Sequence, residues 1–163
     1  MTTLPVIDRE GHRLVALDQV PEDAVDALPV PTPLALVVVR RPDGAVLLGL
    51  NRWRGVRELP GGVREPGETL RATAVRELAE ETGVVVGDLT WVGVALFDLV
   101  DPRRDEYGAV YRVDVDARTT PRPVDGEMLE LTWVDPHGEV PADVTPIDLA
   151  IAAWACGAGQ GGA

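Results

Sequence analysis

The sequence of 163 residues is poor in cysteine and has no long hydrophobic run. Its one cysteine, Cys156, cannot form an internal disulfide, so nothing points to an oxidising compartment. The longest purely apolar run, Leu34 to Val39, is far too short to span a bilayer. The first ten residues, MTTLPVIDRE, lack the charged-then-apolar layout of a signal peptide. We therefore expect a cytoplasmic protein that does not enter a membrane.

Net positive charge is also missing, because the formal charge at pH 7 is −12. A protein that binds long nucleic acid needs a basic surface for the phosphates, so this charge argues against that class. A small phosphorylated ligand is still compatible, since a metal ion and a few local arginines can hold it. The length suits one domain with a substantial core, and an apolar fraction of 45% is typical of a globular protein.

The apolar pattern and the turn signals predict strands interspersed with two helices. We expect a hairpin in residues 6–20, a second hairpin in residues 34–52, and further strands in residues 56–60, 84–100, 107–117 and 129–135. We expect the helices in residues 70–82 and 145–157, with Gly83 ending the first. Residues 21–33, rich in proline, read as an irregular connection, and Gly61 and Gly62 as the opening of a loop. This order suggests an α/β fold with helices packed on a mixed sheet.

Three glutamates, Glu77, Glu80 and Glu81, crowd the end of the first predicted helix. Like charges three or four positions apart on a helix repel by about 0.2–0.5 kcal/mol per pair. At 100° per residue the three carboxylates share roughly a third of the helix circumference, with Arg76 beside them. A divalent cation between the carboxylates would relieve the repulsion; a solvated acidic face is the simpler alternative.

The residues upstream favour the cation. Gly62 is followed after five residues by Glu68, and after seven more by the run Arg-Glu-Leu-Ala-Glu-Glu-Thr-Gly-Val at 76–84. This segment matches the Nudix box, Gly-x5-Glu-x7-Arg-Glu-apolar-x-Glu-Glu-x-Gly-apolar, at every fixed position, and the chain resembles the Nudix hydrolases. The resemblance implies an α/β/α sandwich. It suggests a short N-terminal hairpin and connection in residues 1–30, the Nudix domain in residues 31–155 and a flexible glycine-rich tail in residues 156–163.

The resemblance also implies hydrolysis of a pyrophosphate bond in a nucleoside diphosphate linked to another moiety, with Mg²⁺ as cofactor and Mn²⁺ as a substitute. By the same resemblance, the box glutamates Glu77, Glu80 and Glu81 are metal ligands, and the carbonyl of Gly61 completes the sphere. Arg76 holds a glutamate in place through a charge-assisted pair. Glu68 supports the loop and is a candidate for a second metal site.

The general base is left open between two kinds of residue. In some family members it is a box glutamate, here Glu80 or Glu81, and in others it is a glutamate on a later loop. The later-loop candidate is Glu127, for which a surface acid beside a turn is an equal alternative. Asp101, Asp105 and Glu106 form a weaker candidate cluster, most simply read as a solvated loop.

The substrate is less well determined. A local basic patch beside the predicted loop consists of Arg52, Arg54 and Arg57, which are candidates for phosphate or sugar binding. Exposed arginines that offset the acidic charge are the favoured explanation of the patch. Trp53 between them reads as an edge-of-core residue. A nucleoside triphosphate or a nucleotide sugar is the expected substrate, and a homodimer is compatible with the resemblance.

Two other functions are alternatives. The N-terminal hairpin resembles that of isopentenyl-diphosphate isomerases, which share the fold, but the intact box argues for hydrolysis. A regulatory module without activity would have no reason to keep every box glutamate. His12 and His137 lie near glycines in predicted turns without a metal-ligand partner, so the sequence assigns them no role, and Cys156 reads as a small core residue.

Overall fold

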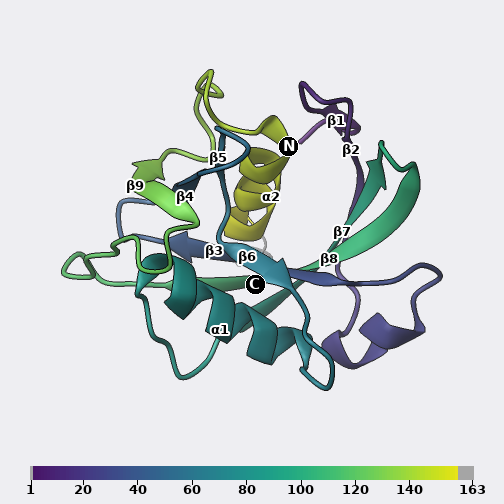
Figure 1. Ribbon diagram of the computed structural model, residues 1–163, viewed down its shortest axis with the longest axis horizontal. Helices are drawn as coiled ribbons and strands as arrows, with labels where there is room; N and C mark the ends of the chain where they lie inside the picture. The colour runs from purple at the N-terminus through teal and green to yellow at the C-terminus, as the bar shows by residue number, and fades with distance from the viewer. Residues whose placement is uncertain (1, 158–163) are drawn as a thin grey trace.

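The computed structural model describes residues 2–157, and its centre is a mixed sheet with one α-helix on each side (Figure 1). The helices are the 3₁₀-helix η1 (Glu22–Ala27) and the α-helices α1 (Leu70–Thr82) and α2 (Pro146–Gly157). The strands are β1 (Val6–Ile7), β2 (Arg13–Asp18), β3 (Leu34–Arg40), β4 (Val46–Asn51), β5 (Arg57–Glu58), β6 (Gly61–Val63), β7 (Thr90–Leu99), β8 (Arg104–Asp114) and β9 (Met128–Val134).

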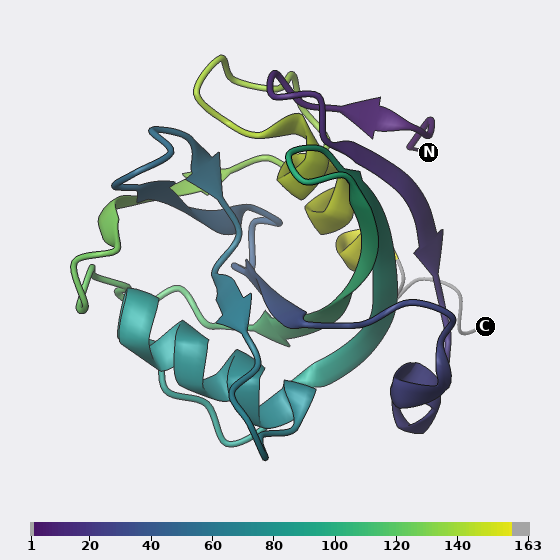
Figure 2. The ribbon, with the colours of Figure 1, turned by 45° about the vertical axis from the view of Figure 1, so that its right-hand side comes forward.

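The sheet has the strand order β1-β2-β7-β8-β3-β4-β5, with β6 paired to β3 and β9 paired to β4. β3 and β8 run parallel, and the other pairs of strands are antiparallel. The long hairpin of β7 and β8 curves around α2, and β2 lies along its outer edge (Figure 2). β3 pairs with β6 near its start and with β4 only at its end, so the sheet divides along this strand. This division separates β6 from β4 and β5.

Two apolar cores lie on opposite faces of the sheet. On β3, Val37 and Val39 belong to the core under α1, whereas Val38 between them belongs to the core under α2. Because successive side chains of a strand point to opposite faces, a strand covered on both sides is apolar throughout. The run of valines in β3 therefore follows from its position between the two helices.

Both predicted α-helices are present at the predicted positions. α1 is capped at its start by Thr69, whose side chain accepts a hydrogen bond from the Ala72 N–H at 3.1 Å. It ends at Gly83, which has a φ of 72° in the left-handed region that glycine tolerates best. The hairpin of β3 and β4 and the N-terminal hairpin of β1 and β2 are also confirmed.

Three details differ from the sequence-based expectations. Gly61 and Gly62 lie in β6, where they pair with β3, and so they do not open a loop. The proline-rich connection contains η1. α2 continues to Gly157, two residues into the predicted flexible tail, and the rest of that tail, residues 158–163, lies outside the described residues. Within residues 2–157 no helix is both long and apolar enough to cross a membrane.

Candidate active site

The C-terminal half of α1 directs a glutamate into the protein. Glu81 has only 1% of its surface exposed, and its carboxylate accepts a hydrogen bond from the backbone N–H of Gly61 at 3.2 Å. Burial, together with the negative charges of Glu127 and Glu77, raises the pKa of Glu81 to about 9. A carboxylate in this position is costly to ionise unless a cation lies beside it.

The two glycines of β6 bring the strand against this face of α1. A Cβ atom on Gly62 would collide with the carboxylate of Glu77, and one on Gly61 would collide with the backbone carbonyl of Ala35. Only glycine permits both approaches. Gly62 therefore does not open a loop, as the sequence suggested, and its small size serves the contact between strand and helix.

The connection between β8 and β9 brings a third carboxylate to the same place. Its backbone N–H groups at Arg122 and Asp125 donate to the carbonyls of Thr82 and Glu80, at 2.9 and 3.1 Å, and so satisfy groups at the C-terminal end of α1. Further along this connection, the carbonyl of Glu127 accepts from the N–H of Arg52 at 2.9 Å. These bonds fix Glu127 opposite the helix.

Glu77, Glu81 and Glu127 each offer a carboxylate oxygen, and these oxygens lie within 4.8 Å of one another. Burial is the main cause that raises the pKa of Glu77, and burial with the charge of Asp125 raises that of Glu127. Three partly desolvated carboxylates at this separation repel one another, and a hard divalent cation is the group that an all-oxygen donor set binds. The chemistry of the cluster therefore fits Mg²⁺ or Mn²⁺.

Arg76 binds glutamates of α1 and of the loop that precedes it. Its guanidinium group donates to Glu68 at 2.8 and 2.9 Å, to Glu77 at 2.8 Å and to Glu80 at 3.3 Å. Glu68 also accepts from the Thr73 hydroxyl at 2.6 Å, and these bonds lower its pKa to about 2. Arg76 thus holds three glutamates and not just one.

Glu80 stands outside the cluster of three carboxylates. Half of its side chain is exposed, and it is held by Arg76 at the rim of the site. The weaker candidates Asp101, Asp105 and Glu106 lie on the hairpin of β7 and β8, away from this cluster, and Glu106 pairs with Arg104 at 3.2 Å.

The structure separates the three arginines of the basic patch. Arg54 forms a two-pronged ion pair with Glu58, which also accepts from the Asn51 side chain at 2.9 Å. Arg57 instead donates to Glu130 and Asp143, each at 2.7 Å. The guanidinium group of Arg52 lies beside Gly126, next to the Glu127 loop.

Trp53, at the tip of the turn between β4 and β5, is 72% exposed. Its prediction as an edge-of-core residue is therefore wrong. The turn itself is rigid, because the side-chain oxygen of the buried Asn51 accepts from the N–H groups of Trp53 and Arg54 at 2.9 and 3.0 Å.

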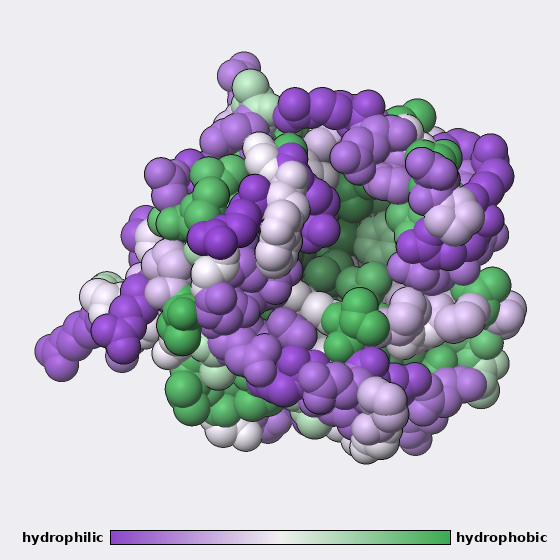
Figure 3. Space-filling model, in the orientation of Figure 1, coloured by the Kyte–Doolittle hydropathy of each residue, from purple (hydrophilic) through white to green (hydrophobic). Residues whose placement is uncertain are grey.

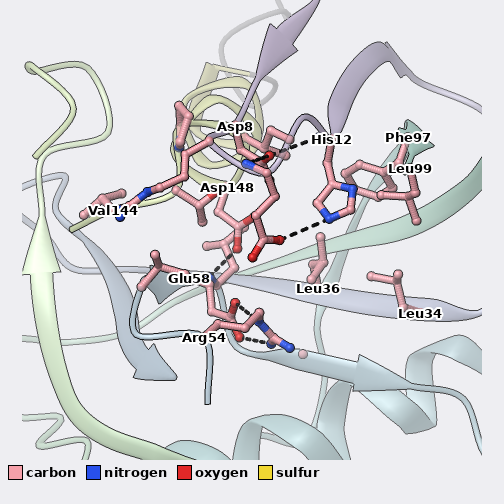
Figure 4. A pocket seen from close by; sticks show the side chains of 18 of the residues that line it. Asp8, His12, Leu34, Leu36, Arg54, Glu58, Phe97, Leu99, Val144 and Asp148 are labelled. Carbon is pink, nitrogen blue, oxygen red and sulfur yellow. Dashed lines mark hydrogen bonds and ion pairs between the residues drawn. The ribbon is translucent and has the colours of Figure 1, made fainter. Parts of the chain in front are cut away.

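A pocket of about 680 Å³ adjoins the cluster. Its lining includes Gly61 and Gly62, which lie against Glu81 and Glu77. The space-filling view shows a hollow with a hydrophobic floor and a hydrophilic rim (Figure 3). The apolar side chains that line the pocket include Leu34, Leu36, Phe97 and Leu99, and the polar ones include Asp8, His12, Arg54, Glu58 and Asp148 (Figure 4).

Sequence reasoning assigned no role to four of these polar residues: Asp8, His12, Glu58 and Asp148. Asp148 lies in the first turn of α2 and accepts from the Leu59 N–H at 2.7 Å, and burial raises its pKa to about 7. An acidic residue two positions after the helix-starting Pro146 was a weak signal for it. His12 and Glu58 gave no comparable signal, because their place in the pocket depends on strands far apart in the sequence.

Comparison with protein families finds a model described as NUDIX domain that matches residues 30–155. The chain is 38% identical over 65 residues to an ADP-ribose pyrophosphatase of Methanocaldococcus jannaschii, covering 40% of this chain and 38% of that protein. It is 30% identical over 109 residues to an oxidized purine nucleoside triphosphate hydrolase of Danio rerio, covering 63% and 65%. It is 38% identical over 93 residues to an isopentenyl-diphosphate Delta-isomerase of Nocardia farcinica, covering 55% and 51%. The matches thus span less than two thirds of each curated relative.

Solved structures share the fold. A MutT/nudix family protein from Enterococcus faecalis superposes with a TM-score of 0.64 at 19% identity, over 85% of this chain and 63% of that one. The NUDIX domain of Shewanella oneidensis NrtR, solved with ADP ribose, superposes with a TM-score of 0.55 at 22% identity, over 66% and 75%. At this level of identity the likeness establishes the α/β fold with its mixed sheet.

Proposed function

The chain belongs to the Nudix hydrolase family, and from this premise we propose that it hydrolyses a pyrophosphate bond in a nucleoside diphosphate linked to another moiety, with Mg²⁺ or Mn²⁺ as cofactor. The observation that carries the proposal is the cluster of Glu77, Glu81 and Glu127, whose oxygens lie within 4.8 Å beside a pocket large enough for a nucleotide moiety. The similarity to the ADP-ribose pyrophosphatase of M. jannaschii and the oxidized purine nucleoside triphosphate hydrolase of D. rerio supports this substrate class.

In this proposal Glu77 and Glu81 hold the metal with the carbonyl of Gly61, and Glu80 joins them from the rim. A bound divalent ion neutralises phosphate oxygens and makes a water molecule more acidic. Arg76 restrains Glu77 and Glu80 so that their oxygens stay at the site. Glu68 supports this arrangement from the loop; its low pKa and its bonds to Arg76 keep it ionised, and it is the candidate for a second metal site.

We assign the general base to Glu127. Glu81 is almost fully buried and its carboxylate already accepts the Gly61 N–H, which suits a ligand. Glu127 is less buried and lies on a loop, and its raised pKa brings it nearer to the value at which a carboxylate accepts a proton efficiently at neutral pH. It would take the proton from the attacking water while the phosphorus–oxygen bond breaks.

The basic residues near the cluster are proposed to bind phosphate. Arg54 is the strongest of the three, because it lines the pocket and lies close enough to Glu127 and Asp148 to interact with both charges. Arg52 lies beside the Glu127 loop and can reach a phosphate at the rim. Arg57 is engaged by two carboxylates and would need to exchange one of them for substrate. A nucleoside triphosphate or a nucleotide sugar fits this arrangement.

The test is a panel of nucleotides that includes ADP-ribose, nucleoside triphosphates and nucleotide sugars, incubated with the protein and Mg²⁺. We expect release of phosphate, pyrophosphate or nucleoside monophosphate from at least one class, and loss of that release in excess EDTA. Turnover that persists in EDTA would overturn the metal mechanism. A protein that binds these nucleotides without cleaving them would instead be a regulatory binding module.

A non-hydrolytic reaction on an isopentenyl-type diphosphate is the second candidate. The matched stretch of the N. farcinica isomerase and the N-terminal hairpin favour it. Incubation with isopentenyl diphosphate and analysis of the products distinguishes the two: an isomer of unchanged mass would support the isomerase, and phosphate release would support hydrolysis.

We further propose that the protein acts in the cytoplasm on small nucleotides and not on long nucleic acid, and that it forms a homodimer. Cell fractionation checks the location. Light scattering on the purified protein checks the oligomeric state.

A further inference from the structure

The pocket beside the carboxylate cluster has a wall that comes from outside the family match. Residues 8–12, the turn between β1 and β2, line the pocket, whereas the NUDIX domain match begins at residue 30. β2 reaches this position because it pairs with β7 along its length. The N-terminal hairpin is therefore part of the pocket and not an appendage.

The turn is held in one conformation. The side chain of Asp8 accepts from the N–H groups of Glu10 and His12 at 2.9 and 3.0 Å, and Gly11 has a φ of 94° that closes the turn. Arg9 donates to the carbonyl of Ala142 at 3.2 Å, which ties the turn to the segment before α2. The wall it forms is thus positioned before any ligand arrives.

The hydrogen bonds of His12 determine which ring nitrogen carries the proton. The backbone N–H of Val100 donates to Nδ1 at 3.2 Å, so Nδ1 is an acceptor. In a neutral imidazole the other nitrogen then carries the hydrogen. Nε2 lies 3.2 Å from the carboxylate of Glu10. His12 itself lies at the pocket (Figure 4).

This tautomer argues against a second metal site. Asp8, Glu10 and His12 have the residue types of a metal-binding group, and each offers an atom within 4.8 Å of the others. A metal could bind Nε2 only if that nitrogen carried no hydrogen. In a neutral ring the hydrogen would then be on Nδ1, where it would face the N–H of Val100. The group is better described as a hydrogen-bond donor, Nε2–H, presented at the pocket.

The donor is available to a ligand. The side chain of Glu10 is 62% exposed, and such surface pairs contribute little stability, so a ligand can displace it readily. The side chain of His12 is 26% exposed and remains anchored through Nδ1. A ligand acceptor can therefore replace Glu10 without moving the imidazole.

The charges of the pocket limit what can occupy it. The side chains that line it include five carboxylates against two guanidinium groups, and one of these, Arg54, is already paired with Glu58. Beside the N-terminal turn, the carboxylates of Asp8 and Glu10 would repel a phosphate, whereas the apolar floor suits a flat ring. Arg54 lies at the end of the pocket near Glu127, where the substrate phosphates are proposed to bind. We propose that this pocket binds the nucleoside part of the substrate, closed by the N-terminal turn, with His12 Nε2–H donating to an acceptor on the base. The inference rests on the proposed function, since it places one end of that substrate.

A binding experiment without metal tests the pocket separately from hydrolysis. Long-range ¹H–¹⁵N spectra of the imidazole rings are recorded in EDTA for three samples. These are the protein without ligand, the protein with adenosine or guanosine at millimolar concentration, and the protein with inorganic pyrophosphate. We expect the Nε2–H tautomer for His12 and a change in its signals with a nucleoside but not with pyrophosphate. His137, exposed in a turn, is the internal control and should not respond. The Nδ1–H tautomer, or a response to pyrophosphate alone, would overturn the proposal.

Two substitutions at His12 separate the donor from the scaffold. His12→Asn keeps an acceptor for the Val100 N–H but has no group at the position of Nε2, whereas His12→Gln places an N–H there. Both variants are assayed with a nucleotide that the protein hydrolyses in the panel. We expect His12→Asn to raise KM by about three- to tenfold with kcat little changed, because one hydrogen bond to the substrate is lost. The KM of His12→Gln should stay nearer to that of the parent. Hydrolysis with unchanged KM in His12→Asn would overturn the role of His12 and leave the proposed function in place. A nucleoside-induced change in the His12 signals, in a protein that hydrolyses no nucleotide of the panel, would support the pocket and overturn the proposed function.

Discussion

Glu81 accepts a hydrogen bond from the backbone N–H of Gly61 at 3.2 Å, and it does so with 1% of its surface exposed. The bond joins the last turn of α1 to β6, in which Gly62 lies against the Glu77 carboxylate of the same helix. One N–H donor does not compensate a buried negative charge, and the pKa of Glu81 is accordingly raised to about 9. The predictions for this residue follow from that imbalance.

Replacing Glu81 with Gln should stabilise the protein without metal and abolish its activity. The amide keeps the size of the side chain and can still accept the Gly61 N–H. Unlike a carboxyl group with a pKa of about 9, it does not have to take up a proton when the protein folds at neutral pH. We expect the free energy of unfolding in EDTA at neutral pH to rise on the order of 1 kcal/mol. We expect hydrolysis to fall by orders of magnitude and the increase in Tm on adding Mg²⁺ or Mn²⁺ to shrink. Melting curves with and without metal, together with turnover rates, check this; an active variant with an undiminished metal-induced shift would show that Glu81 is not a ligand.

The pH dependence of stability should be unusual for an acidic protein. In the folded protein the pKa is about 9 for Glu81 and about 7 for Asp148, above the ordinary values of these groups. At a pH between the ordinary and the raised pKa of either group, the folded state binds more protons than the unfolded state. Stability therefore falls as the pH rises from about 5 to about 9. Melting curves in EDTA across this range should show a declining Tm. In Glu81→Gln the decline should level off near pH 7, and a decline that continued unchanged would contradict the assignment.

The sequence determined the helices well because their signals are local. Leu70, Ala74 and Leu78 recur every four residues and Gly83 ends the helix, so the pattern alone places α1. Glu127 was only a candidate, since its place near α1 depends on backbone bonds from a loop to the end of that helix. No spacing in the sequence encodes such bonds.

The pocket was harder still to predict. Its lining comes from the N-terminal turn, from β3, from β5 and β6, from β7 and β8, and from α2, and these meet only through the sheet order. His12 therefore looked like an ordinary turn residue. Trp53 was placed at the core edge because large aromatic residues are usually buried, whereas its turn is fixed by Asn51 and leaves the ring outside.

Gly62→Ala should damage the carboxylate cluster through size alone. The added methyl group would collide with the Glu77 carboxylate, so that side chain or β6 must move. Because the colliding atoms are the end of a flexible side chain, we expect the free energy of unfolding to change little, whereas displacement of the Glu77 carboxylate should weaken the metal-induced increase in Tm. Gly87→Ala is the matched control, because its added methyl group would meet nothing within 4 Å and its φ is not positive. Equal behaviour of the two variants would mean that the approach of β6 to Glu77 is not needed.

The two engaged arginines should respond differently to alanine. Arg54 lines the pocket beside the cluster, so Arg54→Ala should raise KM with a smaller effect on kcat, the pattern of lost substrate binding. Arg57 bridges Glu130 and Asp143 at 2.7 Å, and each of these partners is more than half exposed. Arg57 can bind a phosphate only by giving up one of these partners, so Arg57→Ala should raise KM less than Arg54→Ala does and lower the free energy of unfolding by up to about 1 kcal/mol per ion pair. Steady-state kinetics and urea unfolding on both variants check this. If KM rises in Arg57→Ala and not in Arg54→Ala, the substrate phosphates lie on the far side of β5 from the pocket; if neither variant changes KM, both arginines act only as surface charge.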